Sequence, residues 1–208
     1  MKQQNRKTHW EEVYRNKATH NVSWFQPHAE RSLRLIKESQ IALNATILDV
    51  GGGASTLVDD LLGAGYKRIN VLDLSAAALA HAQLRCGERA SNVNWLETDI
   101  LETEFAPQSI DLWHDRAVFH FLTSAEDRRR YVAQVLHAVK KDGHVIIATF
   151  AEDGPLQCSG LDVRRYSYTA LHAEFGAPFT LKKHERETHH TPAGKEQYFT
   201  YCYCQKSA

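Results

Sequence analysis

The stretch ILDVGGGAST, residues 47–56, places three consecutive glycines directly after an apolar run. Glycine weakens regular structure, so three in succession after a strand indicate that another group approaches the backbone closely there. The preceding segment ATILDV, residues 45–50, has the continuous apolar character of a buried strand. From Ser55 onward, apolar residues recur at helical spacing. The stretch therefore predicts a strand, a tight glycine turn and a helix.

The same alternation of apolar strands and helical patterns continues along the chain. Further strands are expected over residues 69–74, 92–97, 110–115 and 144–150. The pair Thr123 and Glu126 has the spacing of a capping box, and Gly143 is expected to end the helix that the pair opens. Segments 179–187 and 196–204 are separated by a connection too short for a helical crossover, so they are predicted to form an antiparallel hairpin. The fold class expected is α/β, a doubly wound sheet that is mostly parallel, with one antiparallel strand at the end.

Length and sequence pattern predict one domain over residues 1–208. No repeat or linker divides the 208 residues, a length suited to a single hydrophobic core. Two amphipathic segments, THWEEVYRNK and PHAERSLRLIKES, lie within residues 1–43 and predict helices laid over the sheet. We therefore expect an N-terminal helical lid over residues 1–43 and a Rossmann-like core over residues 44–208.

Charge and hydropathy exclude several classes of partner. Lysine plus arginine equals aspartate plus glutamate at 25 each, so no basic excess attracts nucleic acid or an anionic membrane surface. The start MKQQNRKTHWEE lacks the apolar centre of a signal peptide, and no apolar run approaches the length of a membrane span. A cytoplasmic protein that binds neither nucleic acid nor membrane is expected, with its oligomeric state, monomer or dimer, left open.

The cysteines and histidines show no metal-binding spacing. The four cysteines, Cys86, Cys158, Cys202 and Cys204, form neither a zinc ribbon nor a CxxC motif, so reduced thiols are expected. The 12 histidines lack an H-E-x-x-H or comparable arrangement. No metal site is predicted.

Glycine and acidic residues fall at the carboxyl ends of the first three predicted strands. In open α/β sheets this edge is where ligands bind. The glycine turn leads into a helix whose free N–H groups can hold an anion or a carboxylate. Asp73 follows Gly53 by twenty positions, where a carboxylate can accept both ribose hydroxyls. Asp99, in LETDIL, can accept from an exocyclic amine such as that of adenine. Together these positions indicate an adenosine cofactor.

The spacing of the glycines distinguishes between adenosine cofactors. A dinucleotide fingerprint, G-x-G-x-x-G, would require glycine at position 56, which is Thr56, and the Gly-Lys-Ser/Thr of a P-loop is absent. The stretch resembles the acidic-x-Gly-x-Gly-x-Gly motif of class I S-adenosylmethionine-dependent methyltransferases, matched by Asp49, Gly51 and Gly53. Ser55 replaces the last glycine and is expected to cap the following helix.

The resemblance extends over residues 44–204. VLDLS is similar to the ribose-binding strand end of that family, TDIL to its adenine segment, IDLWHDRAVFHFL to its fourth motif, and LKKDGHVIIATF to the segment that ends in strand five. It implies a small single-domain enzyme with a seven-stranded sheet and S-adenosylmethionine as cofactor. The cofactor-binding residues that follow from it are Trp10, Tyr14, Asp49, Gly51, Gly52, Gly53, Asp73, Leu74, Asp99, Ile100, His114 and Arg116.

Candidate catalytic residues follow the fourth and fifth strands. Methyl transfer from a sulfonium is an in-line displacement, so the enzyme must align the two partners and take up a proton where the acceptor requires it. His114 and His120 are candidate bases, and packing or backbone hydrogen bonding is the alternative for each. Cys158, in the polar loop predicted over residues 150–166, either contacts a soft acceptor or packs. Asp115 and Arg116 either pair with each other or anchor the amino-acid end of the cofactor.

Several functions fit this pattern. Methyl transfer to a small-molecule acceptor is favoured, because the chain is compact and has little charge bias. Protein lysine methylation is an alternative, since some small relatives begin with a similar W-x-x-x-Y helix; those that carry Asp-Lys-Gly after strand four are not matched by HDRAV. A thiol, arsenic or chalcogen acceptor handled by Cys158 is another. A non-catalytic adenosine-binding module is the fourth.

Overall fold

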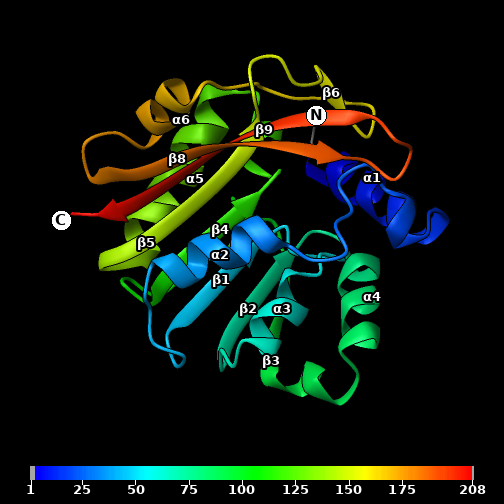
Figure 1. The fold of residues 1–208 in the computed structure, drawn as a ribbon, viewed down its shortest axis with the longest axis horizontal. Helices are drawn as coiled ribbons and strands as arrows, with labels where there is room; N and C mark the ends of the chain where they lie inside the picture. The colour runs from blue at the N-terminus through cyan, green and yellow to red at the C-terminus, as the bar shows by residue number, and fades with distance from the viewer. Residues whose placement is uncertain (1–2, 208) are drawn as a thin grey trace.

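A seven-stranded sheet organises the chain in the computed structural model, which describes residues 3–207 (Figure 1). Residues 1, 2 and 208 of the predicted domain lie outside the described residues. The strand order is β3-β2-β1-β4-β5-β9-β8. The strands are β1 (Thr46–Val50), β2 (Arg68–Asp73), β3 (Val93–Glu97), β4 (Ile110–Arg116), β5 (Val139–Phe150), β8 (Phe179–His190) and β9 (Glu196–Lys206).

The sheet is parallel from β3 to β5, and β9 enters it antiparallel to β5. Strand β8 pairs with β9 as an antiparallel hairpin at the edge of the sheet. The predicted doubly wound sheet with an antiparallel strand near its end is therefore confirmed. Since β1 is central, its carboxyl end lies beside those of β2 and β4, and the register pairs Asp49 with His114.

Helices cover both faces of the sheet (Figure 1). The helices are α1 (Gln3–Asn16), α2 (Glu30–Glu38), α3 (Leu57–Gly63), α4 (Ala76–Cys86), α5 (Ala125–Ala138) and α6 (Tyr168–Phe175). Helices α2, α3 and α4 pack on one face, where Ile47 of β1 points, and α5 and α6 pack on the other with Leu48 and Val50. Successive strand residues point to opposite faces, so the continuous apolar run of β1 contributes to two cores.

Local chemistry moves some element boundaries from their predicted places. Ser124, not Thr123, caps α5, because its hydroxyl accepts from the Asp127 N–H. Gly143 does not end that helix, which stops at Ala138. It lies inside β5 at an irregularity, where a Cβ would come within 2.9 Å of the Lys140 carbonyl oxygen. A side chain there would collide with the backbone, so this glycine is required by a bend in a strand and not by a helix stop.

A short hairpin interrupts the segment predicted as a polar loop over residues 150–166. Strands β6 (Gln157–Cys158) and β7 (Leu161–Asp162) pair antiparallel. The two residues of the turn, Ser159 and Gly160, both have positive φ, at 50° and 77°. Two positive φ values are typical of the tight hairpin turn whose twist suits antiparallel strands. The hairpin fixes the position of Cys158, which is buried.

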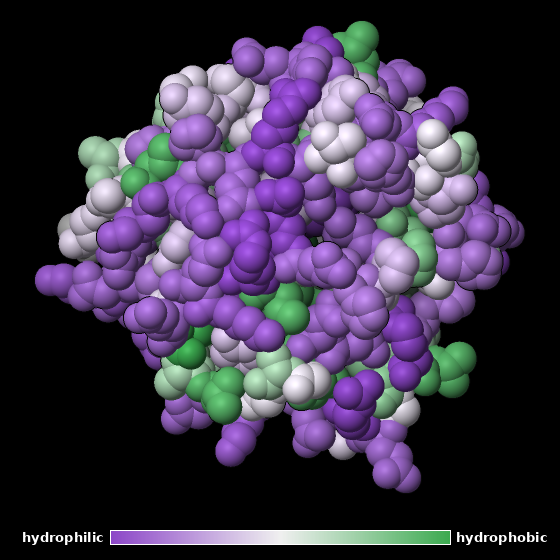
Figure 2. Space-filling model, viewed as in Figure 1, coloured by the Kyte–Doolittle hydropathy of each residue, from purple (hydrophilic) through white to green (hydrophobic). Residues whose placement is uncertain are grey.

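The surface carries no broad apolar area on the face seen in Figure 2, where hydrophobic side chains occur in small scattered groups among hydrophilic ones. The large exposed hydrophobic residues are distributed along the chain: Leu43, Leu84, Leu136, Leu156 and Tyr168. None of the described helices is long and apolar enough to cross a bilayer. The four cysteines are buried and unpaired.

Candidate active site

The glycine turn after β1 is shaped around two carboxylates. A Cβ on Gly52 would overlap the Asp49 carboxylate, and its Cγ would be 2.8 Å away. A Cβ on Gly53 would overlap Oδ2 of Asp73. Gly51 has φ +67°, and a Cβ there would overlap the Val118 side chain. What approaches the backbone at this turn is therefore the pair of acidic side chains that end β1 and β2, together with the loop after β4.

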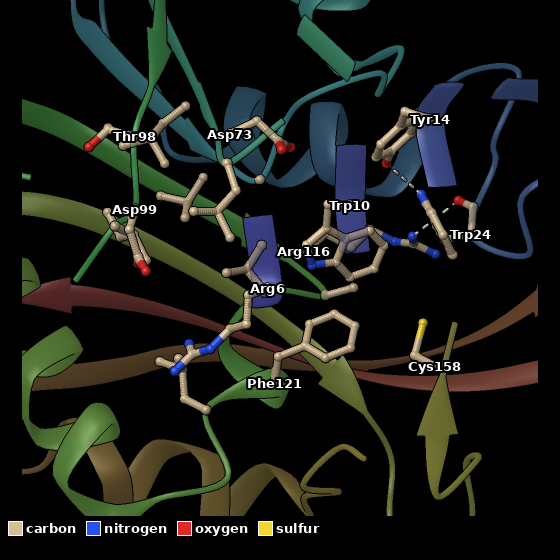
Figure 3. A pocket seen from close by; sticks show the side chains of 18 residues that line it. Arg6, Trp10, Tyr14, Trp24, Asp73, Thr98, Asp99, Arg116, Phe121 and Cys158 are labelled. Carbon is tan, nitrogen blue, oxygen red and sulfur yellow. Dashed lines mark hydrogen bonds between the residues drawn. The ribbon is translucent and has the colours of Figure 1, made fainter. Parts of the chain in front are cut away.

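The larger of two adjoining cavities opens beside this turn. One end is formed by the carboxyl ends of β2 and β3, where Asp73, Thr98 and Asp99 lie together (Figure 3). Oδ1 of Asp73 accepts from the Ser75 N–H at 2.8 Å, and Oδ1 of Asp99 accepts from the Leu101 N–H at 2.9 Å. Burial raises the pKa of Asp73 to about 7. Leu74 and Ile100 complete this end.

The other end of the cavity is aromatic. Trp10 of α1 lies edge to face with Trp24 and with Phe121, at centroid distances of 5.6 and 5.3 Å. The Trp24 indole N–H donates to the Tyr14 hydroxyl at 3.2 Å (Figure 3). The β6–β7 hairpin brings Cys158 to the same end. Side chains from four separate segments thus build an apolar chamber opposite the acidic end.

A second cavity adjoins the first through Tyr14, Trp24, Val50, Gly51 and Arg116, which line both. It is lined by Asp49, Gly52 and His114 among others. Oδ1 of Asp49 lies 2.7 Å from Nδ1 of His114, whose Nε2 lies 2.9 Å from the Ser32 hydroxyl. Oδ2 of Asp49 is buried and has no hydrogen-bond partner among the described residues. An unpaired buried carboxylate oxygen is costly, so this atom indicates a ligand donor such as an ammonium group.

Comparison with known proteins agrees with this arrangement. The family described as "Methyltransferase domain" matches residues 47–143, from β1 to β5. The structure of the N-methyltransferase NodS from Bradyrhizobium japonicum, in complex with S-adenosylhomocysteine, is similar with a TM-score of 0.72 at 16% identity, covering 95% of this chain and 98% of that one. Residues 47–143 form a methyltransferase domain, and the chain has the fold of S-adenosylmethionine-dependent methyltransferases.

Further relatives of this methyltransferase act on different kinds of acceptor. The 1,6-didemethyltoxoflavin-N1-methyltransferase of Burkholderia thailandensis has a TM-score of 0.69 at 18% identity, with 99% of this chain and 85% of that chain covered. A curated relative, the eEF1A lysine and N-terminal methyltransferase of Danio rerio, is 24% identical over 148 residues. This alignment covers 70% of the present chain but only 21% of that protein, so the chain spans about a fifth of the relative's length.

The cavities of the methyltransferase fit its cofactor, S-adenosylmethionine. The acidic end offers carboxylates for hydroxyl and amine donors, and the unpaired Oδ2 of Asp49 offers an acceptor for the methionine ammonium. The glycine turn lets the carboxylates of Asp49 and Asp73 pack directly against its backbone. The hydroxyl of Ser55 supports the turn by accepting from the Leu57 N–H at 3.1 Å. The N-cap position of α3 is Thr56, so the prediction that Ser55 caps this helix is wrong by one residue.

Arg116 of the methyltransferase is committed to partners on the edge hairpin. Its guanidinium pairs with Glu187 of β8 at 3.1 Å, donates to the Tyr201 hydroxyl at 2.9 Å, and lies over the Phe199 ring. It does not pair with Asp115, whose carboxylate instead accepts from Val118 N–H and from the Tyr131 hydroxyl. The suggested pairing of Asp115 with Arg116 is therefore wrong, because the two side chains point to opposite faces of β4.

The two candidate histidines differ in their surroundings, and neither lines the larger cavity. Both ring nitrogens of His114 are within hydrogen-bond distance of Asp49 and Ser32. Burial lowers the pKa of His120 to about 3, and its Nδ1 accepts from the Phe150 N–H at 3.4 Å. Because Nδ1 is the acceptor, the proton of the neutral ring is on Nε2, and the one ring lone pair, on Nδ1, is already engaged by the Phe150 N–H. A role as general base does not fit this geometry.

Cys158 is the one catalytic candidate from the sequence that the structure places at the larger cavity, within the described chain. Burial raises the pKa of its thiol to about 12. The side chain is therefore a neutral, polarisable wall at neutral pH and not a thiolate nucleophile.

Helix α1 of the methyltransferase is held over the site by polar contacts with α4, α5 and the end of β3. Oε1 of Glu11 accepts from the Ala76 N–H at 2.6 Å, so it caps the start of α4. Arg6 pairs with Asp127 of α5 at 3.2 Å, and Lys7 pairs with Glu97 at the end of β3 at 2.6 Å. These contacts span the cavity mouth and place Trp10 and Tyr14 inside it.

Sequence reasoning did not assign several residues of this site. Thr98 and Phe121 each sit beside a residue that was assigned, so inclusion of neighbouring strand-end positions would have found them. Trp24 could have been found from the sequence, because it is an aromatic residue between two predicted helices. No sequence pattern indicates Glu187 and Ser32, because they come from distant elements and contact Arg116 and His114 only in the folded chain.

Proposed function

We propose that this methyltransferase acts on a small-molecule acceptor. The observation that carries the proposal is the aromatic end of the larger cavity, where Trp10 of α1 packs against Trp24 and Phe121. An apolar chamber with few polar groups is typical of small-molecule sites.

In this proposal the acidic end holds the adenosine of the cofactor. Asp73 accepts from the ribose hydroxyls, and Asp99, with Leu74 and Ile100 beside it, contacts the adenine. The methionine portion extends towards the second cavity, where Asp49 accepts from the ammonium and the N–H groups of the turn from Gly51 to Gly53 face the carboxylate. Arg116 and His114 hold this end in place through Glu187 and Asp49.

The cofactor supplies a methyl group on a sulfonium, which is already a good leaving group. The residues of the chain therefore have to align the acceptor with that methyl and exclude water. Trp10 and Tyr14 of α1 supply the cover, which agrees with a lid formed by the segment before β1. In this proposal, no side chain at the aromatic end gives or takes up a proton during methyl transfer.

Protein lysine methylation is the second candidate. The name of the Danio rerio relative, an eEF1A lysine and N-terminal methyltransferase, favours it. The end of β4 weakens it, because the segment HDRAV, residues 114–118, does not match the Asp-Lys-Gly that some lysine methyltransferases carry there.

A screen for S-adenosylhomocysteine release tests the choice between these functions. The panel contains nitrogen heterocycles, amines, carboxylates, thiols, arsenite and peptides rich in lysine, with Asp73→Ala as the enzyme control. We expect release with a small molecule and none from Asp73→Ala. Release with lysine peptides alone would replace the proposal with the second candidate.

A further inference from the structure

The titratable groups around the larger cavity are arranged unevenly. Within the described residues, the titratable side chains that line it are Arg6, Tyr14, Asp73, Asp99, Arg116 and Cys158. The two carboxylates come from the carboxyl ends of β2 and β3 (Figure 3), where the proposed function places the adenosine. The aromatic end therefore has a phenol, a thiol and two arginines, of which Arg116 is paired with Glu187 and Arg6 with Asp127. Among the described lining residues it has no histidine, lysine or free carboxylate.

None of these groups at the aromatic end can accept a proton at neutral pH. Burial raises the pKa of the Tyr14 hydroxyl and brings that of the Cys158 thiol to about 12, so both keep their protons. Arginine stays protonated in proteins. An acceptor that must lose a proton to the enzyme during methyl transfer, such as an alcohol or a phenol, finds no base here.

The same end also disfavours an anionic acceptor. The thiol of Cys158 lines the chamber, and burial there raises its pKa, which means that the thiolate is unfavourable. An anionic sulfur of an acceptor in the same place meets the same penalty. The nearest buried cation, Arg116, already has a carboxylate partner at 3.1 Å and an aromatic ring below its guanidinium. The walls are the faces and edges of Trp10, Trp24 and Phe121, which suit a flat apolar molecule.

Resting on the proposed function, we propose that the acceptor is an aromatic heterocycle whose uncharged ring nitrogen receives the methyl group. The nitrogen lone pair forms the new N–CH₃ bond while the bond between that carbon and the sulfonium sulfur breaks. The bonding pair stays with the sulfur, which becomes the thioether of S-adenosylhomocysteine, and the positive charge moves to the ring nitrogen. No proton moves, so the chamber needs no base.

Binding to the protein saturated with S-adenosylhomocysteine tests the inference without turnover. Isoquinoline and 2-naphthalenethiol have the same bicyclic size, and at about pH 8 the first is neutral while the aryl thiol is ionised. Calorimetry should show isoquinoline binding and thiolate binding at least about tenfold weaker, because the thiolate must be desolvated. Equal or tighter binding of the thiolate overturns the proposal.

Matched variants locate the binding. Phe121→Leu should weaken isoquinoline binding about three- to tenfold by removing an aromatic contact. Phe105→Leu is the control, since Phe105 packs against Trp113 away from the cavity and its loss should leave the binding unchanged. Thermal melts establish that both variants fold. An equal effect of the two variants contradicts the assigned chamber.

Turnover supplies the second readout. With isoquinoline, quinoline and pyridine derivatives, the pH at which kcat/KM falls should follow the pKa of each acceptor, because only the neutral ring nitrogen reacts. The cofactor is kept saturating at every pH, so that the titration of Asp73 does not enter the profile. A break at one fixed pH across the series then reveals an enzyme base and overturns the inference. If S-adenosylhomocysteine itself does not bind, the proposed function fails; if it binds and no heterocycle does, only this inference fails.

Discussion

Gly53→Ala tests the role of the glycine turn. The new Cβ would overlap Oδ2 of Asp73 and lie 2.9 Å from the Ala78 Cβ, so the carboxylate of Asp73 must rotate away from its position at the end of β2. A hydrogen bond to a charged group contributes roughly 1.5–3 kcal/mol net. Two ribose hydroxyls therefore lose at least about 3 kcal/mol, which corresponds to an affinity for S-adenosylhomocysteine weakened about a hundredfold or more.

Gly63→Ala is the matched control. Gly63 ends α3, and a Cβ there meets nothing within 4 Å. Because alanine is about 1 kcal/mol better than glycine in a helix, this variant should melt at the same temperature or slightly higher and should bind S-adenosylhomocysteine normally. Calorimetric titration gives the affinities, and a thermal melt shows that each variant folds.

A double-mutant cycle identifies the route of the effect. If Gly53→Ala acts by moving Asp73, it should weaken binding far less in an Asp73→Asn background than in the wild type. Binding by Gly53→Ala within about threefold of wild type would refute the reasoning, since a loss of about 3 kcal/mol corresponds to an affinity change of about a hundredfold or more.

Three further predictions concern charge. Burial raises the pKa of Asp73 to about 7 in the fold against 3.8 in the unfolded chain, so its contribution to the free energy of unfolding falls as pH rises from about 4 to 7. S-adenosylhomocysteine needs the ionised carboxylate and should bind up to about tenfold weaker per pH unit below about 7, whereas Asp73→Asn should show a flat calorimetric profile. Glu11→Gln, which weakens the cap that joins α1 to α4, should speed ligand dissociation in stopped-flow measurements, and Glu12→Gln, an exposed neighbour, should not. Glu187→Ala leaves Arg116 buried without its carboxylate, which costs about 3–5 kcal/mol and should lower Tm by roughly 10 °C in a calorimetric scan; an unchanged Tm would show that the pair contributes nothing.

The parts of the fold that depend on local pattern could be predicted from the sequence. The apolar strands, the hairpin of β8 and β9, and the carboxylates of Asp49, Asp73 and Asp99 at strand ends all follow from periodicity and spacing. These features need only the rule that parallel strands end at one edge of the sheet.

The remaining features depend on contacts between distant segments. Histidine is a common catalytic base, so the sequence alone suggests this role for His120. Only the burial of its ring behind Phe121 shows that the ring stays neutral. Arg116 is adjacent to Asp115 in sequence, yet its partner is Glu187, 71 residues away. The prediction that Gly143 ends a helix was wrong, because a bend in a strand such as β5 requires glycine just as a helix end does. A cytoplasmic location and the oligomeric state stay open predictions.

The most direct test of the account is a comparison of two ligands against two variants. S-adenosylhomocysteine carries both the adenosine and the amino-acid portion, and 5′-methylthioadenosine lacks the amino acid. By calorimetry, Asp73→Asn should weaken the binding of both ligands, because Asp73 lies at the adenosine end. Asp49→Asn should weaken only S-adenosylhomocysteine, since the proposed placement puts the methionine ammonium beside the unpaired Oδ2 of Asp49. Equal losses of both ligands in Asp49→Asn, or unchanged binding of both in Asp73→Asn, would contradict the placement of the cofactor.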